Sequence, residues 1–266
     1  MGQPDVGTPV TISRNHCFDQ PAVPWSHAAG RFVRRVVPGG GNARVWSGCN
    51  AVRGLISGDV TMPGRLFLTR DLAEIADWLG AGPADITHPE PRLDLAPGGE
   101  IVVFDGERLC RMRWGMIMSG RVNARKRPVM ETIINARSET VFGKSAFAGV
   151  RRCLVPVDGW YEWTGKTRRK TRWRIRPHDA TPLAFAGIYD VWNGPGGVEV
   201  PQVATITCEP NAEIGDIHHR MGVVLPRGLW AGWLSGEAVA MDPAPDGSFV
   251  IEDATEMERS SAQNSV

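Results

Sequence analysis

The strongest constraint on the fold is a succession of short apolar runs separated by turn residues. Asp105-Gly106, between the runs 101–104 and 109–114, is typical of a tight hairpin turn. The runs that we expect to form strands are 101–104, 109–114, 153–157, 160–163, 171–176, 183–191, 203–208 and 221–225. Many strands at short spacing, with few helices between them, indicate an α+β fold built on a mainly antiparallel sheet.

A few helices are expected between these strands. The segment 71–79 has one apolar helical face, a capping residue at its start (Thr69 or Asp71) and a terminating Gly80. The other segments predicted to be helical are 138–147 and 226–234, together with a short helix or turn over 211–217.

Composition divides the chain into three regions. Residues 1–61 are rich in Gly, Pro, Ser and Arg and have weak hydrophobic periodicity, so we predict a poorly structured extension. Residues 62–243 hold the expected strands and helices and form the predicted domain. Residues 244–266 are polar and acidic and are predicted to be a flexible tail. A chain of 266 residues suits one medium domain plus a tail, or at most two domains.

Several classes of protein are disfavoured by what the sequence lacks. It has no run of about 18 apolar residues for a membrane helix and no secretory signal, so a cytoplasmic protein without a membrane partner is expected. The 5 cysteines form no Cys-x-x-Cys pair or other zinc-site spacing, so no metal is predicted. No Gly-x-Gly-x-x-Gly or Walker loop occurs, so neither a nucleotide nor any other cofactor is expected. We expect a monomer.

The charge is distributed unevenly along the chain. Residues 113–176 contain 16 Lys and Arg against 4 Asp and Glu, which gives +12. Because the whole chain carries +1, the remainder carries −11. A basic middle segment suits a phosphate-binding surface. The protein is also expected to be nucleoid-associated. The alternative is a set of charged faces that only contact solvent.

Four segments combine polar and aromatic residues and contain the candidates for chemistry: 113–116, 134–140, 152–163 and 217–221. Glu162 lies between Tyr161 and Trp163 on an apolar strand, where burial would raise its pKa and suit it to acid/base catalysis. The alternative for Glu162 is an ordinary salt-bridge partner. His218 is as consistent with a core or surface histidine as with a catalytic one.

The remaining polar and aromatic candidates also have two interpretations. Asn135 and Arg137 are suited to holding a ligand, or to capping and bracing the next helix. Trp114, Trp160 and Trp163 are typical of a core, although aromatic rings in a basic groove also stack on the bases of single strands.

Together the four segments resemble the SOS response-associated peptidase (SRAP) family. The family patterns are Arg-Trp-Gly-Leu-Ile, Ile-Asn-Ala-Arg-x-Glu-Thr, Arg-Cys-Leu-x-Pro-x-x-Gly-(Phe/Tyr/Trp)-Tyr-Glu-Trp and Ile-His-x-Arg-Met-Pro, and all four have counterparts here in family order. Pro97 fits the family's Asn-x-Ala-Pro element. The resemblance covers residues 62–235 and implies a SRAP-like, barrel-like sheet with flanking short helices.

The resemblance also implies a chemistry and a partner. Family members act in the DNA damage (SOS) response on abasic sites in single-stranded DNA, where an N-terminal Cys links to the sugar aldehyde as a thiazolidine. By similarity, Glu162 would be the acid/base of linkage and of self-processing, His218 would assist Schiff-base chemistry, and Asn135 would hold the abasic sugar. The residues that would bind the DNA are Arg65, Trp114, Arg137, Arg168, Arg169 and Lys170.

The sequence departs from the family at the nucleophile. The counterpart of Met-Cys-Gly-Arg is Met62-Pro63-Gly64-Arg65, so Pro63 stands where the family has Cys, and 61 residues precede Met62. None of the cysteines (17, 49, 110, 153 and 208) is N-terminal, so none can replace it in a thiazolidine. Two smaller departures are Gly222 in place of Pro, expected to loosen the turn after His218, and Asp94 in place of Asn, expected to weaken phosphate binding nearby.

Three functions follow from these departures. The first is a SRAP-like protein that binds abasic single-stranded DNA, either self-processing before Pro63 or, if translation starts at Met62, using the amine of Pro63 in a Schiff base that permits strand cleavage. The second is an inactive module of the same fold that only binds DNA or a partner. The third is a general hydrolase using Glu162 and His218, which ranks last because no nucleophile elbow, metal set or paired cysteine is present.

Overall fold

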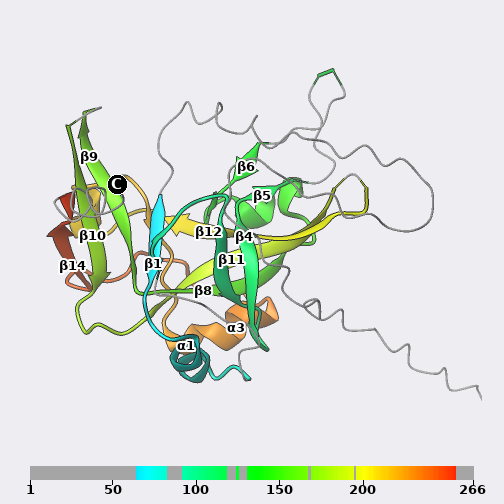
Figure 1. The fold of residues 1–266 in the computed structure, drawn as a ribbon, viewed down its shortest axis with the longest axis horizontal. Helices are drawn as coiled ribbons and strands as arrows, with labels where there is room; N and C mark the ends of the chain where they lie inside the picture. Colours follow the sequence, from blue (N-terminus) through cyan, green and yellow to red (C-terminus); the bar gives the residue numbers. More distant parts are fainter. Residues whose placement is uncertain are drawn as a thin grey trace, which may run out of the picture. The chain divides into compact units, whose positions relative to one another are not determined.

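The computed structural model describes residues 64–82, 92–118, 124–125, 131–166, 169–194 and 196–255, all within one compact unit that spans Asp59–Val266. Figure 1 shows short helices at the edges of two main sheets, and a third sheet has only two strands. The predicted extension 1–61, and with it Pro63, lies outside the described residues, as does Arg168. The helices of the described part of the chain are all too short or too polar to cross a membrane.

The larger sheet closes into a five-stranded barrel. Its strands are β3 (Glu100–Phe104), β4 (Leu109–Trp114), β8 (Arg151–Val157), β11 (Leu183–Asn193) and β12 (Glu199–Cys208). They pair in the order β11-β8-β3-β4-β12, and β12 pairs again with β11 to close the ring. Every pairing in the ring is antiparallel except β4 with β12. The mainly antiparallel, barrel-like sheet expected from the sequence is therefore confirmed.

The second sheet is antiparallel and open. Its order is β14-β10-β9-β1-β2, formed by β14 (Phe249–Asp253), β10 (Arg169–Pro177), β9 (Gly159–Lys166), β1 (Arg65–Leu68) and β2 (Arg92–Leu95). Strand β14 lies in the segment predicted to be a flexible tail. The prediction of a flexible tail is therefore wrong for residues 249–253, because five residue pairs join β14 to β10 and Phe249 is buried.

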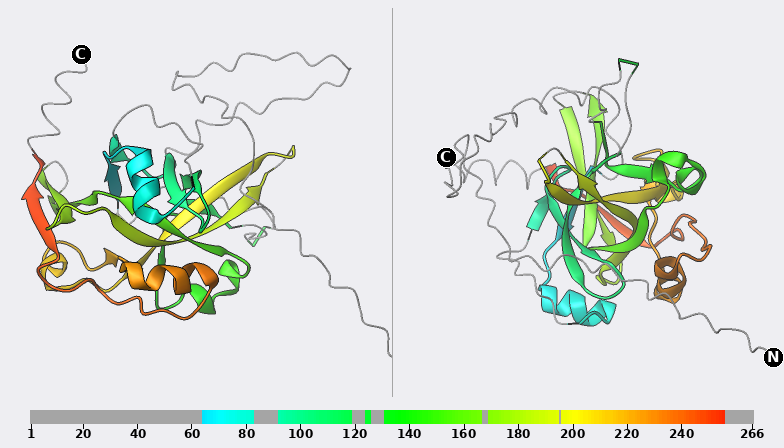
Figure 2. Two further views of the ribbon diagram at one scale, coloured as in Figure 1. Left: turned by 90° about the horizontal axis from the view of Figure 1, so that it is seen from below. Right: turned by 90° about the vertical axis from the view of Figure 1, so that its right-hand side faces the viewer.

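Short elements flank the barrel. The strands are β5 (Met116–Ile117), β6 (Thr132–Ile133), β7 (Asn135–Arg137) and β13 (Met221–Gly222); the helices are α1 (Leu72–Leu79), α2 (Ala212–Gly215), α3 (Trp230–Ser235), η2 (Val141–Gly143), η3 (Ser145–Phe147) and η4 (Arg227–Leu229). The helix predicted over 138–147 is instead two separate 3₁₀ turns, because the backbone is extended at Lys144 between them. Helix α3 packs against the outside of β8, where the Trp233 indole donates a 2.8 Å hydrogen bond to the Cys153 carbonyl (Figure 2).

Trp160 joins the two sheets. Its ring, fully buried, lies 5.5 Å from the ring of Phe185 in the barrel and 5.1 Å from that of Phe249 on β14. Both contacts are edge-to-face, the arrangement that aromatic quadrupoles favour. A single indole therefore sets the distance between β9 and the barrel wall.

Gly222 makes room for the same cluster. A Cβ at this position would lie 2.8 Å from the ring of Phe185, which is itself packed against Trp160. Gly222 is also held in β13 by pairing with Thr207. Glycine at this position, where the family has Pro, therefore leaves space for a buried ring beneath the strand.

We expect Gly222→Ala to lower the free energy of unfolding by about 1–3 kcal/mol, because the Phe185 ring has no space to move away from the added methyl. Gly228→Ala is the matched control, since a Cβ there meets nothing within 4 Å. Urea denaturation of both variants checks this. Equal midpoints for the two would show that the cluster around Phe185 tolerates the extra carbon.

Candidate active site

Glu162 is the most unusual ionisable residue in the described part of the chain. It lies on β9 on the same face as Trp160, and only 1% of its surface is exposed. The carboxylate accepts a hydrogen bond from the backbone N–H of Gly64, while its Oε1 has no partner among the described residues. Burial raises the pKa of Glu162 well above its usual value, against a smaller lowering by the Gly64 hydrogen bond. A buried carboxyl of this kind can carry a proton near neutral pH.

The partner of Glu162 identifies what the carboxyl can act on. The Gly64 N–H belongs to the peptide bond between residues 63 and 64, so the described structure brings the acid to the position where the family has its nucleophile. Pairing of β1 with β9 produces this contact, with Arg65 opposite Tyr161 and Phe67 opposite Gly159.

Asp158 holds the other end of β1. Its carboxylate accepts hydrogen bonds from the Thr69 N–H at 2.6 Å, the Thr69 hydroxyl at 2.7 Å and the Arg70 Nε at 2.9 Å. Its own N–H donates to the Phe67 carbonyl at 2.9 Å. Sequence reasoning missed this role, although an Asp directly before the Gly that opens a strand was a signal for such a turn.

A second group of polar residues lies beside the end of β12. Asn135, on β7, accepts a hydrogen bond through its side-chain oxygen from the hydroxyl of Thr205, and β7 runs parallel to β12 with Arg137 opposite Thr207. Asn135 is half-buried and Arg137 is exposed. Asn135 therefore has an orientation set by the barrel, while Arg137 projects its charge to the surface.

Arg220 connects this group to His218. Its guanidinium donates to both oxygens of Glu139, at 2.6 and 2.9 Å, and to the Thr207 carbonyl at 2.6 Å. The hydrogen bond from Arg220 holds the pKa of Glu139 below its usual value. Neither Arg220 nor Glu139 was predicted to be a site residue, although both lie in the segments that contain the candidates.

His218 is half-buried and held by its neighbours. Its Nδ1 accepts a hydrogen bond from the Arg220 N–H at 3.1 Å, so in the neutral ring the proton sits on Nε2. Its backbone N–H donates to the Ile214 carbonyl at 2.8 Å, and its ring stacks on that of His219 with centroids 4.3 Å apart. A defined tautomer of this kind suits transfer of a proton by Nε2.

Packing links the two groups. Trp160, two residues before Glu162 on the same face of β9, contacts Phe185, and Phe185 lies under Gly222, two residues after Arg220. Figure 1 shows the end of β12 directed toward β1. Trp160 of β9 and Gly222 of β13 thus lie against the same buried ring, that of Phe185.

The residues predicted to bind DNA occupy different environments. Trp114 is fully buried, and its indole donates to the Ile134 carbonyl at 3.2 Å, so the prediction of base stacking is not supported by its position. Arg65 forms an ion pair with Asp94 at 2.8 Å. Arg169 and Lys170 are exposed at the start of β10, next to the turn of the β9–β10 hairpin.

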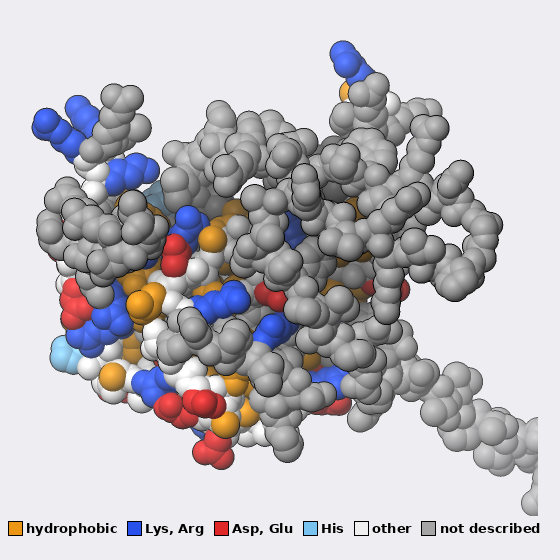
Figure 3. Space-filling model, in the orientation of Figure 1, with side chains coloured by type: hydrophobic (Ala, Val, Ile, Leu, Met, Phe, Trp, Pro, Cys, Tyr) orange, Lys and Arg blue, Asp and Glu red, His pale blue; other side chains and the backbone are white. Residues whose placement is uncertain are grey.

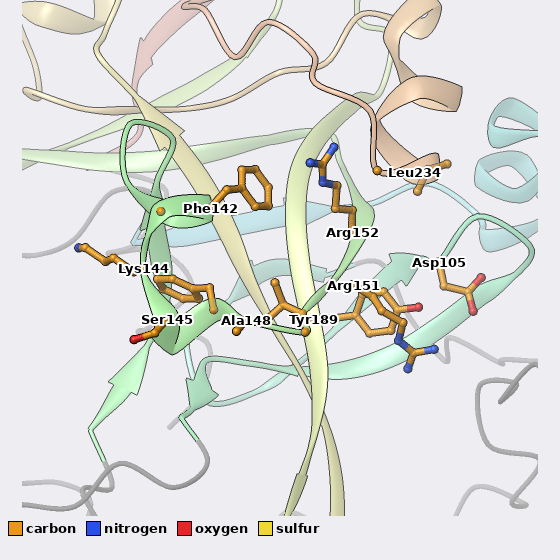
Figure 4. A pocket seen from close by; sticks show the side chains of 14 residues that line it. Asp105, Phe142, Lys144, Ser145, Ala148, Arg151, Arg152, Tyr189 and Leu234 are labelled. Atoms are coloured by element: carbon orange, nitrogen blue, oxygen red, sulfur yellow. The ribbon is translucent and has the colours of Figure 1, made fainter.

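A separate hollow of about 760 Å³ lies between η2, η3 and β8 and contains none of the predicted site residues. Figure 4 shows Phe142 and Arg152 side by side at one end and Arg151 next to Tyr189 at the other. The Arg152 guanidinium lies 4.4 Å from the Phe142 ring centroid and 4.6 Å from that of Trp233. These contacts tie η2 to α3 and give the arginine a structural role.

The burial of Glu162 predicts how the stability of the folded protein depends on pH. The pKa of Glu162 is raised in the folded protein, so its carboxyl stays protonated there at pH values above about 4.3, where it ionises in the unfolded chain. Stability is therefore lost as pH rises from that value through the folded pKa. Glu162→Gln mimics the protonated form, so we expect a gain of about 1–3 kcal/mol at pH 8 that disappears toward pH 4. Thermal melts across this range measure it.

Glu139→Gln is the matched control with the opposite sign. The pKa of Glu139 is lowered by Arg220, so its contribution is present above about pH 4.3 and is lost as pH falls. Its carboxyl is partly exposed, and we expect a loss of about 0.2–1 kcal/mol at pH 8. Both variants losing stability at pH 8 would contradict a buried, protonated Glu162.

Comparison with known proteins agrees with this architecture. The chain is 34% identical over 161 residues to "Abasic site processing protein YoaM" of Bacillus subtilis, which covers 58% of this chain and 70% of the relative. It is 35% identical over 153 residues to "Abasic site processing protein YoqW" of the same organism, covering 54% and 67%. "Abasic site processing protein HMCES" of Gallus gallus is 29% identical over 168 residues, and the chain spans about half of that relative, 48%.

Solved structures show the same fold. A crystal structure of a Bacteroides thetaiotaomicron protein superimposes with a TM-score of 0.60 at 20% identity, covering 71% of this chain and 90% of that one. A Bordetella bronchiseptica protein gives 0.60 at 21% identity, covering 71% and 98%. Residues 62–261 match the family model described as SOS response associated peptidase (SRAP). The chain therefore belongs to the SRAP family.

Proposed function

We propose that this protein binds single-stranded DNA at abasic sites and processes them in the DNA damage response. The observation that carries the proposal is the buried Glu162 at the amide of Gly64, directly after the residue that stands at the family's nucleophile position. The names of the curated relatives, which are abasic site processing proteins, support the same substrate.

Binding of the strand is assigned to the basic surfaces around the site. Figure 3 shows Lys and Arg side chains gathered over β9 and β10. The exposed Arg169 and Lys170, with Arg168 beside them in the sequence, would hold flanking phosphates, and Arg137 would hold a phosphate near Asn135. These contacts are electrostatic and carry no sequence preference, as suits a protein that must find damage anywhere.

The site residues divide the chemistry between them. Glu162 would give and take the protons needed when an amine adds to the abasic aldehyde, because its carboxyl is buried and its pKa is raised. His218, with Nδ1 occupied by the Arg220 N–H, would move a proton through Nε2. Asn135, oriented by Thr205, would hold the opened sugar. These roles require an amine at the position of residue 63.

Pro63 limits which covalent product is possible. A thiazolidine needs an amine and a thiol on one terminal residue, and proline has no thiol. A terminal Pro63 would attack the aldehyde carbon through its secondary amine, form a carbinolamine and lose water to give an iminium ion. The product is therefore a reversible Schiff base, which permits β-elimination, in place of a stable link. Without a terminal Pro63, the scaffold binds DNA only.

Borohydride trapping tests these alternatives. Two forms are mixed with a single-stranded oligonucleotide that carries one abasic site: the full chain, and a chain whose first residue is Pro63, with each N-terminus confirmed by mass. Borohydride reduces an iminium to a stable amine, so we expect a cross-linked band on a denaturing gel for the form that begins at Pro63. Glu162→Gln in that form should slow trapping by about 10²-fold or more.

The controls separate catalysis from binding. One extra residue before Pro63 should abolish the band while leaving affinity unchanged. Binding without any band in either form would assign the protein as a binding module of this fold. Absence of both binding and trapping would overturn the proposed function altogether.

The basic hairpin makes a separate prediction. Replacing Arg168, Arg169 and Lys170 with Gln should flatten the dependence of log K on log salt by about 0.7 for each phosphate that the variant no longer neutralises. Arg227→Gln, in η4 directly before α3, removes one positive charge outside the hairpin and should leave the slope unchanged. Fluorescence anisotropy with an undamaged oligonucleotide measures both. An unchanged slope in the triple variant would exclude the hairpin from the interface.

A further inference from the structure

Arg172 is a buried cation without a counter-ion among the described residues. Only 9% of its surface is exposed, and its guanidinium lies over the Tyr161 ring, 3.8 Å from the centroid, and 5.7 Å from the Trp163 ring centroid. Its Nε is buried and has no hydrogen-bond partner among the described residues, and none of the described ion pairs involves Arg172. Burying an unpaired charge is unfavourable, and contact with aromatic rings offsets only part of that cost.

Neighbouring strands extend the positive charge across one face of the open sheet. Tyr161 on β9 lies opposite Arg65 of β1 and opposite Arg174 of β10, and Trp163 lies opposite Arg172. Directly opposed residues of antiparallel strands point to the same face. This face is the opposite side of β9 from Glu162, because side chains alternate along a strand.

The carboxylates on this face are fewer than the arginines. Glu252 pairs with Arg176 at 2.6 Å and only weakly with Arg174 at 3.7 Å, and the Arg174 Nε is buried without a partner. Asp94 pairs with Arg65. Among the described residues, four arginines (65, 172, 174 and 176) thus face two carboxylates (94 and 252), and the excess of two positive charges belongs to Arg172 and Arg174.

The electrostatics of Tyr161 agree with this arrangement. Burial raises the pKa of its hydroxyl, while Arg172 and Arg174 act in the opposite direction. Both guanidinium groups therefore lie close enough to the phenol to affect its titration. The Arg174 guanidinium also lies over the Phe67 ring, 4.7 Å from its centroid, so aromatic contacts hold both arginines in place before any ligand arrives.

We propose that Arg172 and Arg174 form a phosphodiester-binding site for the single strand, on the face of the β10-β9-β1 sheet opposite Glu162. The planar guanidinium forks suit bidentate contact with phosphate oxygens. The adjacent, partly exposed Trp163 supplies an aromatic surface beside the phosphate. The inference rests on the proposed function and adds to it a second contact, which holds the strand on the side of β9 away from the acid.

The test uses the full chain and an undamaged fluorescent oligonucleotide, with anisotropy titrations at several salt concentrations. Arg172→Met and Arg174→Met keep the aliphatic contact with the rings and remove the charge. We expect each to weaken binding by about tenfold at low salt and to reduce the salt slope by about 0.7. Arg227→Met, which removes a charge at η4, should do neither.

Two further measurements separate a binding role from a structural one. Glu252→Gln frees Arg174 from its weak pair and should tighten DNA binding, which a structural role for the ion pair would not produce. Thermal melts should find Arg172→Met at least as stable as the natural chain, because it removes an unpaired buried charge. Inorganic phosphate, compared with chloride at equal ionic strength, should raise the Tm of the natural chain and not that of Arg172→Met.

The outcomes are distinct. Unchanged affinity and slope in both folded Met variants would overturn this site while leaving the proposed function in place. A second outcome would also overturn the proposed site: phosphate raises the Tm only when Arg172 is present, while DNA binding does not change in the Met variants. The site would then bind an anion other than the single strand. If the natural chain binds no single-stranded DNA, the proposed function fails and this inference fails with it.

Discussion

The pairing of β1 with β9 is the interaction on which the rest of the site depends. Three hydrogen bonds to the Asp158 carboxylate anchor the end of β1, and the register that follows places Gly64 at Glu162. Trp160, on the same strand, then sets β9 against the barrel through Phe185. One strand pair therefore aligns the acid with the residue 63 peptide and joins the open sheet to the segment that carries His218.

Two buried ionisable side chains on neighbouring strands lower the stability of the fold. In the part of the chain that the structure describes, one oxygen of Glu162 has no hydrogen-bond partner and Arg172 has no carboxylate partner. The two residues lie on opposite faces of the β9–β10 pair. Replacing either with a neutral residue of similar shape would help an isolated fold, because buried polar groups without partners lower stability. Ionisable groups with strongly perturbed environments gather at functional sites, and Glu162 lies at the amide of Gly64, directly after the nucleophile position of the family.

For Asp94 and Gly222, two departures from the family pattern, the structure shows contacts that the sequence does not contain. In the sequence alone, Asp94 suggested weaker phosphate binding, which stays a prediction; in the structure its carboxylate forms an ion pair with Arg65. Gly222 suggested a looser turn, yet the residue is held in β13 over the Phe185 ring, where any side chain would collide. The sequence predicted only the backbone conformation at Gly222. Packing against Phe185 explains why the residue has no side chain.

The sequence by itself determined the strands of the barrel, the capped helix α1, the family and the polar segments of the site, because alternation, caps and motif order are local properties. Three other features depend on contacts between segments that are distant in the sequence. Strand β14 forms only because β10 offers it an edge, 138–147 breaks into 3₁₀ turns that pack on α3, and Trp114 is core. The raised pKa of Glu162 and the aromatic contacts of Arg172 likewise depend on burial and on neighbours that only the folded chain brings together.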